Sequence, residues 1–328
     1  MNGKRWIALG AVALIILAAG AFRFGAALFQ TDTEDFLAGA GGEEMSERVT
    51  EQGTDTGKIA VIHLEGVIQA GGGGVLGGGY DHQLLLDQFD HAAADPEVEG
   101  IVFRVNTPGG GVVESDEIHD KVQEVQEEYG KDVYVSMGSQ AASGGYFVSA
   151  PAERIYANGQ TITGSLGVIM QSFNVSELAD NLGISDQTIK SGEFKDIMSA
   201  TREMTDDDEE ILQSIVDDAY TRFIDVIENG RDLSRDEVEN LADGRIYTGN
   251  QAAENGLVDG VGNLDDTIGA MKEDLDRDPD VVEYERGFNM GQFFGMTADT
   301  LLEHRRVDEL AAWLELNQGP QLMYLYTD

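Results

Sequence analysis

Cysteine is absent from this chain of 328 residues, and basic residues are few, with 21 lysines and arginines against 61 acidic residues. The lack of cysteine excludes disulfide bonds, thiolate metal ligands, a cysteine nucleophile and lipidation of a cysteine. The formal net charge of −40 repels phosphate groups, so a nucleic-acid partner is excluded as well.

The acidity is spread along the whole chain and resembles that of proteins from salt-loving archaea, in which molar salt screens charge within about 3 Å. A haloarchaeal-like, halophilic protein is therefore expected. The content of 41% hydrophobic and 25% charged residues is that of a folded globular protein. The length suits one main core with additions at its ends.

The N-terminus contains a long apolar run, from Trp6 to Phe22, which would span about 26 Å as a helix. Lys4 and Arg5 precede it and acidic residues follow, which places the body outside the cytoplasm by the positive-inside rule. Residues 1–29 are thus predicted to form a single-pass membrane anchor. The alternative is a cleaved signal peptide, since Ala19–Ala21 resembles a cleavage site.

The rest of the chain divides by composition. A polar juxtamembrane linker is predicted over residues 30–57, a folded core over 58–276, and an extension over 277–328 that packs on the core or on a neighbouring subunit through its apolar end. A glycine-rich stretch, Gly71 to Gly79, reads either as a mobile loop over a site or as a tolerated insertion.

Hydrophobic periodicity alternates between strand and helix, without a long internal repeat. This rhythm predicts an α/β fold with a parallel β-sheet and flanking helices. Strands are expected at 58–64, 98–105, 133–137 and 154–157, and helices after Ser143 and at 84–94, 113–129, 206–228, 235–241, 249–255 and 264–275.

Four segments rich in glycine or small residues stand where strands should end: 106–111, 142–146, 163–168 and 190–196. Ligands of α/β sheets bind at the carboxyl ends of the strands. Ser143 lies at a strand-to-helix turn, which exposes Oγ and leaves the N–H of Gly144 free to stabilise an oxyanion. Gly109 and Gly110 would let a turn present bare backbone N–H groups to a ligand.

A serine nucleophile needs a base, and all five histidines lie outside these segments. Lysine is rare here, yet Lys190 and Lys195 flank one of the glycine turns. A lysine acts as a base only when burial lowers its pKa towards neutrality, and a hydroxyl such as that of Ser165 can orient it. From spacing alone, the reading of Lys195 as a solvated partner of Asp196 or Glu193 is slightly favoured over that of a base.

In this order, the four segments and the apolar N-terminus resemble the SppA-type signal peptide peptidases, which are Ser–Lys peptidases related in fold to Clp protease and the crotonases. The resemblance covers about residues 58–271. It implies that Ser143 is the nucleophile, Lys195 the general base and Ser165 the hydroxyl that orients the lysine. The backbone of Gly110 and Gly144 would form the oxyanion hole, and no metal or cofactor is needed.

The resemblance also implies the substrates and the assembly: remnant signal peptides and other unfolded membrane-proximal peptides, cut within a ring-shaped homo-oligomer. Longer relatives repeat the core and draw serine and lysine from different repeats. A single-core chain would therefore share each site between neighbouring subunits.

Two alternatives stay open: a membrane serine protease of the stomatin-operon type that cuts one partner protein, and a non-catalytic crotonase-like scaffold. An acyl-CoA enzyme is disfavoured because basic residues for the CoA phosphates are lacking.

Overall fold

The computed structural model describes residues 45–71, 79–286 and 322–326. The predicted membrane anchor at 1–29 and most of the stretch from Gly71 to Gly79 lie outside the described residues. Among the helices that are described, none combines the length and the apolar character needed to cross a membrane. Residues 47–284 and 322–326 belong to one compact unit, which contains all the elements discussed below except the ends of two strands, at residues 45–46 and 285–286.

The main sheet is largely parallel, as the alternation of strands and helices predicts. Its order is β1-β11-β2-β3-β5-β6-β10, and neighbouring strands run parallel from β11 to β10. A short strand, β7, pairs parallel with the last residues of β5, past the part of β5 that pairs with β6. Strand β7 also pairs antiparallel with β9. The strands are β1 Met45–Glu51, β2 Lys58–Glu65, β3 Val98–Thr107, β5 Asp132–Ala142, β6 Arg154–Ala157, β7 Ile162–Gly164, β9 Ile246–Thr248, β10 Gly260–Val261 and β11 Asp280–Arg286.

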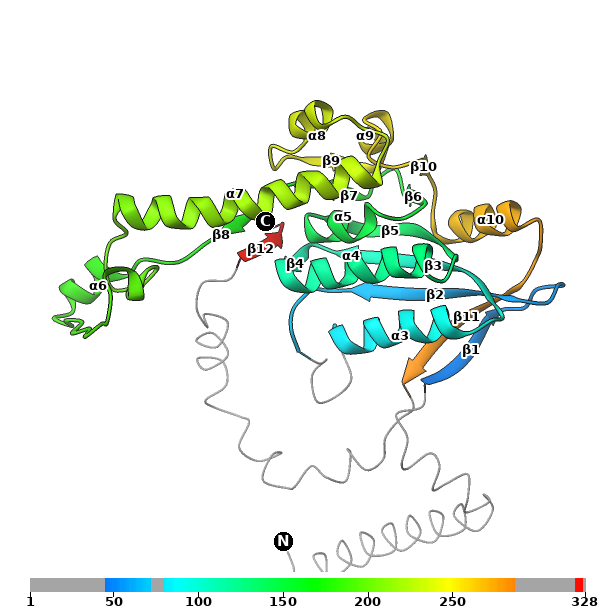
Figure 1. Ribbon diagram of the computed structural model, residues 1–328, viewed down its shortest axis with the longest axis horizontal. Coiled ribbons are helices and arrows are strands. Elements are labelled where there is room, and N and C mark those ends of the chain that lie inside the picture. Colours follow the sequence, from blue (N-terminus) through cyan, green and yellow to red (C-terminus); the bar gives the residue numbers. More distant parts are fainter. Residues whose placement is uncertain (1–44, 72–78, 287–321, 327–328) are drawn as a thin grey trace, which may run out of the picture. The chain divides into compact units, whose positions relative to one another are not determined.

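Helices cover both faces of this sheet (Figure 1). Helices α3 (His82–Ala94), α4 (Val112–Glu127) and α5 (Gly144–Ser149) lie on one face, where Phe89 of α3 meets Phe103 of β3 with ring centroids 5.0 Å apart. Helix α10 (Leu264–Leu275) covers the opposite face. The remaining helices are α6 Ser176–Asn181, the 3₁₀ helix η1 Glu193–Asp196, α7 Asp206–Gly230, α8 Arg235–Leu241 and α9 Gly249–Glu254.

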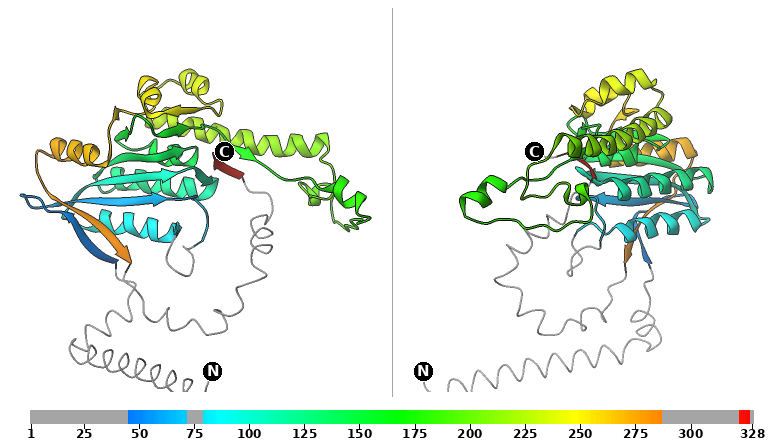
Figure 2. Two further views of the ribbon diagram at one scale, coloured as in Figure 1. Left: turned by 180° about the vertical axis from the view of Figure 1, so that it is seen from behind. Right: turned by 60° about the vertical axis from the view of Figure 1, so that its left-hand side comes forward.

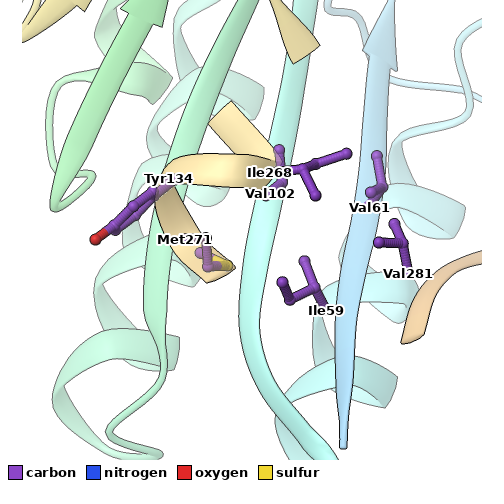
Figure 3. Close-up of a cluster of buried hydrophobic side chains, with 7 residues drawn as sticks. All are labelled: Ile59, Val61, Val102, Tyr134, Ile268, Met271 and Val281. Atoms are coloured by element: carbon purple, nitrogen blue, oxygen red, sulfur yellow. The ribbon is translucent and has the colours of Figure 1, made fainter. Parts of the chain in front are cut away.

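The core under α10 shows how strand alternation builds two faces. Val102 packs towards α10 while its neighbour Phe103 points to α3, because successive side chains of a strand face opposite sides. Figure 3 shows this cluster, which joins strands β2, β3, β5 and β11 to α10: Ile59, Val61, Val102, Tyr134, Ile268, Met271 and Val281. Gly100 lets α10 approach, since a Cβ there would lie 2.7 Å from the Met271 sulfur.

A second, three-stranded sheet lies beside the first, in the order β4-β12-β8. Strand β4 is Gly109–Gly111, β8 is Ile169–Met170, and β12 is Leu322–Leu325 at the end of the chain. Strand β12 runs antiparallel to both of its neighbours. The C-terminus is thereby attached to the same loop that the sequence singles out for its glycines.

Two strands of the main sheet lie outside the segment expected to be the core. Strand β1 falls within the segment interpreted as a linker, and β11 within the extension after residue 276. The side chains of β1 are mostly exposed, so it has no apolar period, and backbone pairing beside β11 holds it in place. In β11, by contrast, Val281 and Val282 are buried and complete the core.

Candidate active site

Ser143 occupies a strained turn between β5 and α5. Its φ of 53° and ψ of −115° fall in a region that residues with a side chain rarely adopt, and such strain persists only where the surroundings impose it. The Ser143 N–H donates to the Gly164 carbonyl at 2.8 Å, and the Ser143 carbonyl accepts from the N–H groups of Tyr146 and Phe147 at 2.9 Å each. The backbone on both sides of the serine is therefore fixed.

The side chain of Ser143, unlike its backbone, is not hydrogen-bonded within the described part of the chain. The residue is 1% exposed, yet its hydroxyl makes no hydrogen bond to any described residue. The backbone thus holds the serine in place, and no basic side chain within the described ranges is hydrogen-bonded to its hydroxyl.

Ser165 lies next to this turn because β7 pairs with β5. Ala142 is in register with Gly164, so Ser143 and Ser165 directly follow paired residues of adjacent strands. Ser165 also has a positive φ, 50°, and its N–H donates to the Arg245 carbonyl at 2.7 Å. The sheet thus brings the two serines together on rigid backbone.

Strand β4 supplies a glycine backbone against the start of α5. A Cβ on Gly109 would lie 2.7 Å from the backbone nitrogen of Gly144, and a Cβ on Gly110 would overlap the Ile68 carbonyl. Gly109 additionally has a φ of 101°, which glycine adopts without strain. Close approach requires glycine at both positions, and at Gly109 the backbone conformation favours it as well.

The C-terminal strand β12 lies along this glycine backbone (Figure 1). Tyr324 pairs with Gly110. The Tyr324 carbonyl oxygen lies close to both Gly109 and Gly144: a Cβ on Gly144 would be only 3.1 Å from it. A peptide strand therefore already occupies the surface beside Ser143.

The side chain of Tyr324 fills an aromatic pocket. It is fully buried, with ring centroids 4.8 Å from Phe147 and 4.7 Å from Phe223, and its hydroxyl donates to the Ala219 carbonyl at 3.1 Å. Phe147 lies one turn after Ser143 on α5, whereas Phe223 belongs to α7. The pocket thus connects the serine turn to α7. Burial among these rings raises the pKa of Tyr324 above its ordinary value.

Lys195 lies in another part of the fold. It is exposed in η1, and within the described ranges its ammonium group makes no ion pair. Its neighbour Asp196 is instead bound by Lys190 at 2.8 Å and by Arg202 at 3.0 Å. These two cations, with Lys190 as the larger cause, lower the pKa of the Asp196 carboxyl.

Helix α7 separates Lys195 from Ser143. Arg202 also pairs with Asp208 at the start of α7, while Phe223, fifteen residues further along the helix, contacts Phe147 beside the serine. Fifteen residues correspond to about 22 Å of helix. Figure 2 shows α6 and the loops around it standing away from the sheet at the far end of α7. The described chain brings together Ser143, Ser165, Gly110 and Gly144, but it does not bring Lys195 to them.

The described residues include one cluster with metal-ligand chemistry, formed by Asp116, His119 and Asp120 on α4. Arg222 pairs with these carboxylates at 2.8 and 3.5 Å, so the cluster is an ion-pair network. His119 is buried against Phe147, and this burial lowers its pKa. Its Nδ1 is bonded to Asp120 and it has no bond to the serine turn in the described structure.

Sequence reasoning did not single out Tyr324, Phe147 or Phe223 as site residues. The apolar end of an acidic chain was a signal for Tyr324, but its partner surface could not be read from spacing. The two phenylalanines are 76 residues apart in sequence and meet only because α7 crosses α5.

Comparison with known proteins places the same region in a family. Residues 125–278 match the model of peptidase family S49. A candidate signal peptide peptidase SppA of Enterococcus faecium is 34% identical over 345 residues, which cover 99% of both chains. A candidate protease of Synechocystis is 40% identical over 70% of this chain and 78% of its own length. Protease 4 of Salmonella typhi is 35% identical over 66% of this chain and 34% of its own length.

Proposed function

Because this chain belongs to peptidase family S49 and is a serine peptidase of the SppA type, we propose that it cuts peptides with a Ser–Lys dyad, Ser143 as nucleophile and Lys195 as general base. The observation that carries the proposal is the strained turn at Ser143, which lies beside a glycine backbone already paired with a peptide strand.

The reaction starts when neutral Lys195 takes the proton of Ser143 as Oγ attacks a peptide carbonyl carbon. The N–H groups of Gly110 and Gly144 stabilise the oxyanion, and Ser165 orients the lysine. The tetrahedral intermediate collapses to an ester on Ser143, and the amine leaves with a proton. Water then attacks the ester in the same way and releases the acid.

The substrate binds as an antiparallel strand on β4, in the place that β12 occupies. Pairing through the backbone makes binding independent of most of the peptide sequence. A side chain opposite Gly110 would enter the pocket of Phe147 and Phe223, which favours aromatic and apolar residues there. Remnant signal peptides, which are rich in apolar residues, are the proposed natural substrates.

Lys195 is supplied by a neighbouring subunit. The separation along α7 supports this, and so does the surface around the lysine, where Phe173 is 65% exposed and Ile189 fully exposed. Large apolar side chains gathered on one exposed segment mark an interaction surface. A head-to-tail contact repeated around a ring would cover that segment and complete each site.

The proposed location of the enzyme and the salt conditions in which it works rest on its amino-acid sequence. The apolar segment within residues 1–29 anchors the chain in the membrane with the catalytic body outside the cytoplasm. The net charge of −40 suits a medium of molar salt. Anchoring would keep the peptidase where signal peptides accumulate.

Complementation tests the dyad and its sharing between subunits. Full-length Ser143→Ala and Lys195→Ala are each expected to lose at least about 10²-fold in kcat/KM on a fluorogenic apolar peptide in molar salt, because nucleophile and base work as a unit. Lys190→Ala is the matched control and keeps most of the activity, since its side chain is engaged with Asp196.

Co-expressed Ser143→Ala and Lys195→Ala subunits should regain activity in about a quarter of the sites on random mixing. A mixture that stays inactive in assemblies shown to contain both variants would place the dyad within one chain. An active Ser143→Ala protein would refute the proposed nucleophile.

A further inference from the structure

Ser115 carries a buried hydroxyl that has no partner. The residue lies one turn into α4 and is 0% exposed, and its Oγ has no hydrogen bond anywhere in the described residues. Serine and threonine within helices commonly donate to the carbonyl four residues earlier. Ser149 does so with Gly145 at 2.6 Å and Thr267 with Asn263 at 3.0 Å, but Ser115 does not use this bond.

The unpaired hydroxyl lies against Gly144, the residue after the candidate nucleophile. Ser115 Oγ lies 2.8 Å from the position that a Cβ on Gly144 would take. The Tyr324 carbonyl oxygen is 3.1 Å, and the Cα of Gly109 3.2 Å, from that same position. Hydroxyl, glycine backbone and a peptide carbonyl therefore converge at one place.

An unpaired buried hydroxyl costs free energy, and each such group in a folded protein calls for an explanation. A peptide strand is present beside Ser115, and the hydroxyl still has no acceptor. Donors that serve catalysis are directed at the oxyanion position and not at the oxygen of the ground-state carbonyl. When the carbonyl carbon becomes tetrahedral its oxygen moves, and a donor without a ground-state partner can then gain one.

We propose that Ser115 is a third hydrogen-bond donor of the oxyanion site, whose Oγ–H binds the developing oxyanion together with the N–H groups of Gly110 and Gly144. This inference rests on the proposed function of Ser143. It also explains why residue 144 is glycine, since any side chain there would displace the Ser115 hydroxyl from the site.

The test is Ser115→Ala in the full-length enzyme, assayed with a fluorogenic apolar peptide and with a peptide aldehyde that forms a tetrahedral adduct. Loss of a donor used only in the transition state lowers kcat by about 10²-fold and leaves KM unchanged. The affinity for the aldehyde should fall in parallel. The thermal midpoint should stay equal or rise, because an unpaired buried hydroxyl is removed.

Two matched variants separate this role from a structural one. Ser149→Ala also removes a fully buried serine hydroxyl, but one that is bonded, so it should lower the thermal midpoint and leave kcat within about twofold. Tyr284→Phe removes an unpaired buried hydroxyl on β11, away from the serine, and should leave both kcat and aldehyde affinity unchanged.

The outcomes distinguish the two proposals. Wild-type kcat and aldehyde affinity in Ser115→Ala, with Ser143→Ala inactive, would overturn the role of Ser115 and leave the nucleophile intact. A wild-type enzyme without peptidase activity would instead overturn the proposed function. Should Ser115→Ala not fold, Ser115→Cys, which keeps the shape but donates weakly, must show the same loss in kcat and aldehyde affinity.

Discussion

The two halves of the proposed dyad lie in regions that are built in opposite ways. The turn at Ser143 is buried and fixed by backbone hydrogen bonds to Gly164, Tyr146 and Phe147. The segment from 171 to 205, which carries Lys195, is largely exposed and is held by side-chain ion pairs such as Arg202 with Asp208.

The difference shows what one chain can and cannot position by itself. Paired strands fix the position of Ser143, because both its N–H and its carbonyl group are hydrogen-bonded. The lysine segment leaves apolar side chains such as Leu182, 67% exposed, and Ile189 in water. Exposed apolar side chains of this kind mark interaction surfaces, and for this reason we propose that a neighbouring subunit covers the segment.

The comparison between the serine turn and the lysine segment can be tested by adding one methyl group to each region. The largest effect is expected beside the serine, at Gly110. Gly110→Ala would push a Cβ into the Ile68 carbonyl, so β4 must move away from Ile68. Overpacking of this kind costs about 1–3 kcal/mol of unfolding free energy. We expect kcat/KM to fall by at least about 10²-fold, since the oxyanion site loses a donor.

Gly192→Ala is the counterpart beside Lys195. No atom of the described structure lies within 4 Å of a Cβ there, and its φ of −156° is extended backbone that any residue adopts. Thermal unfolding and peptide assays should show values close to wild type. Equal tolerance of Ala at 110 and 192 would show that the glycine backbone of β4 is not a constrained part of the site.

A smaller effect is expected from loosening the strand that lies over the site. Tyr324→Ala removes the aromatic anchor of β12, so the tail should leave β4 more often and compete less with substrate. We expect KM for an apolar peptide to fall by about 10- to 30-fold, since the loss of one hot-spot contact costs about 2 kcal/mol. Leu322→Ala, on the same strand but paired with Met170 of β8, is the control and should leave KM nearly unchanged.

Hydrogen exchange of the β4 amides measures the same event directly. Faster exchange in Tyr324→Ala with an unchanged or higher KM would mean that substrate does not bind where β12 lies.

Much of the sheet could be predicted from sequence, because apolar periodicity marks buried strands. The predicted strand at 98–105 is β3, and the predicted helix at 264–275 is α10 with the same bounds. Strand β1 was not predicted, because its side chains are mostly exposed and it is held by backbone pairing. Periodicity reports which side chains are buried and carries no information about an edge held by backbone hydrogen bonds.

The site was predictable to the extent that it depends on local chemistry. Ser143 and Ser165 follow glycine-rich strand ends, and the structure places them side by side. Ser115 left no such signal, since a serine one turn into a helix is ordinary, and only its missing partner and its distance to Gly144 distinguish it. The sequence also could not show that α7 separates Lys195 from the serine. That separation depends on how α7 is oriented against α5, and helical periodicity does not report this orientation.

The smallest effect is expected from weakening an ion pair that holds the segment around Lys195. Asp208 lies in the first turn of α7, where it forms a capping box with Thr205 and pairs with Arg202, and the bond to Arg202 is the chief cause that lowers the pKa of its carboxyl well below the ordinary range. A lowered pKa means that the charged form stabilises the fold above the unfolded value of about 4, and that this contribution is lost as pH falls through the folded value. Asp208→Asn should therefore loosen the segment around Lys195 at neutral pH.

Limited proteolysis of this segment should become faster in Asp208→Asn by no more than about fivefold, in line with a single ion pair whose arginine is partly exposed to solvent. The difference from wild type should be complete above about pH 5 and shrink only below about pH 4, because the carboxylate stays charged until then. Asp225→Asn, which touches another pair on the same helix, controls for charge and should leave cleavage near Lys195 unchanged. If the difference already closes at pH 6, Arg202 does not stabilise the Asp208 carboxylate, and the lysine segment must be held by contacts other than its ion pairs.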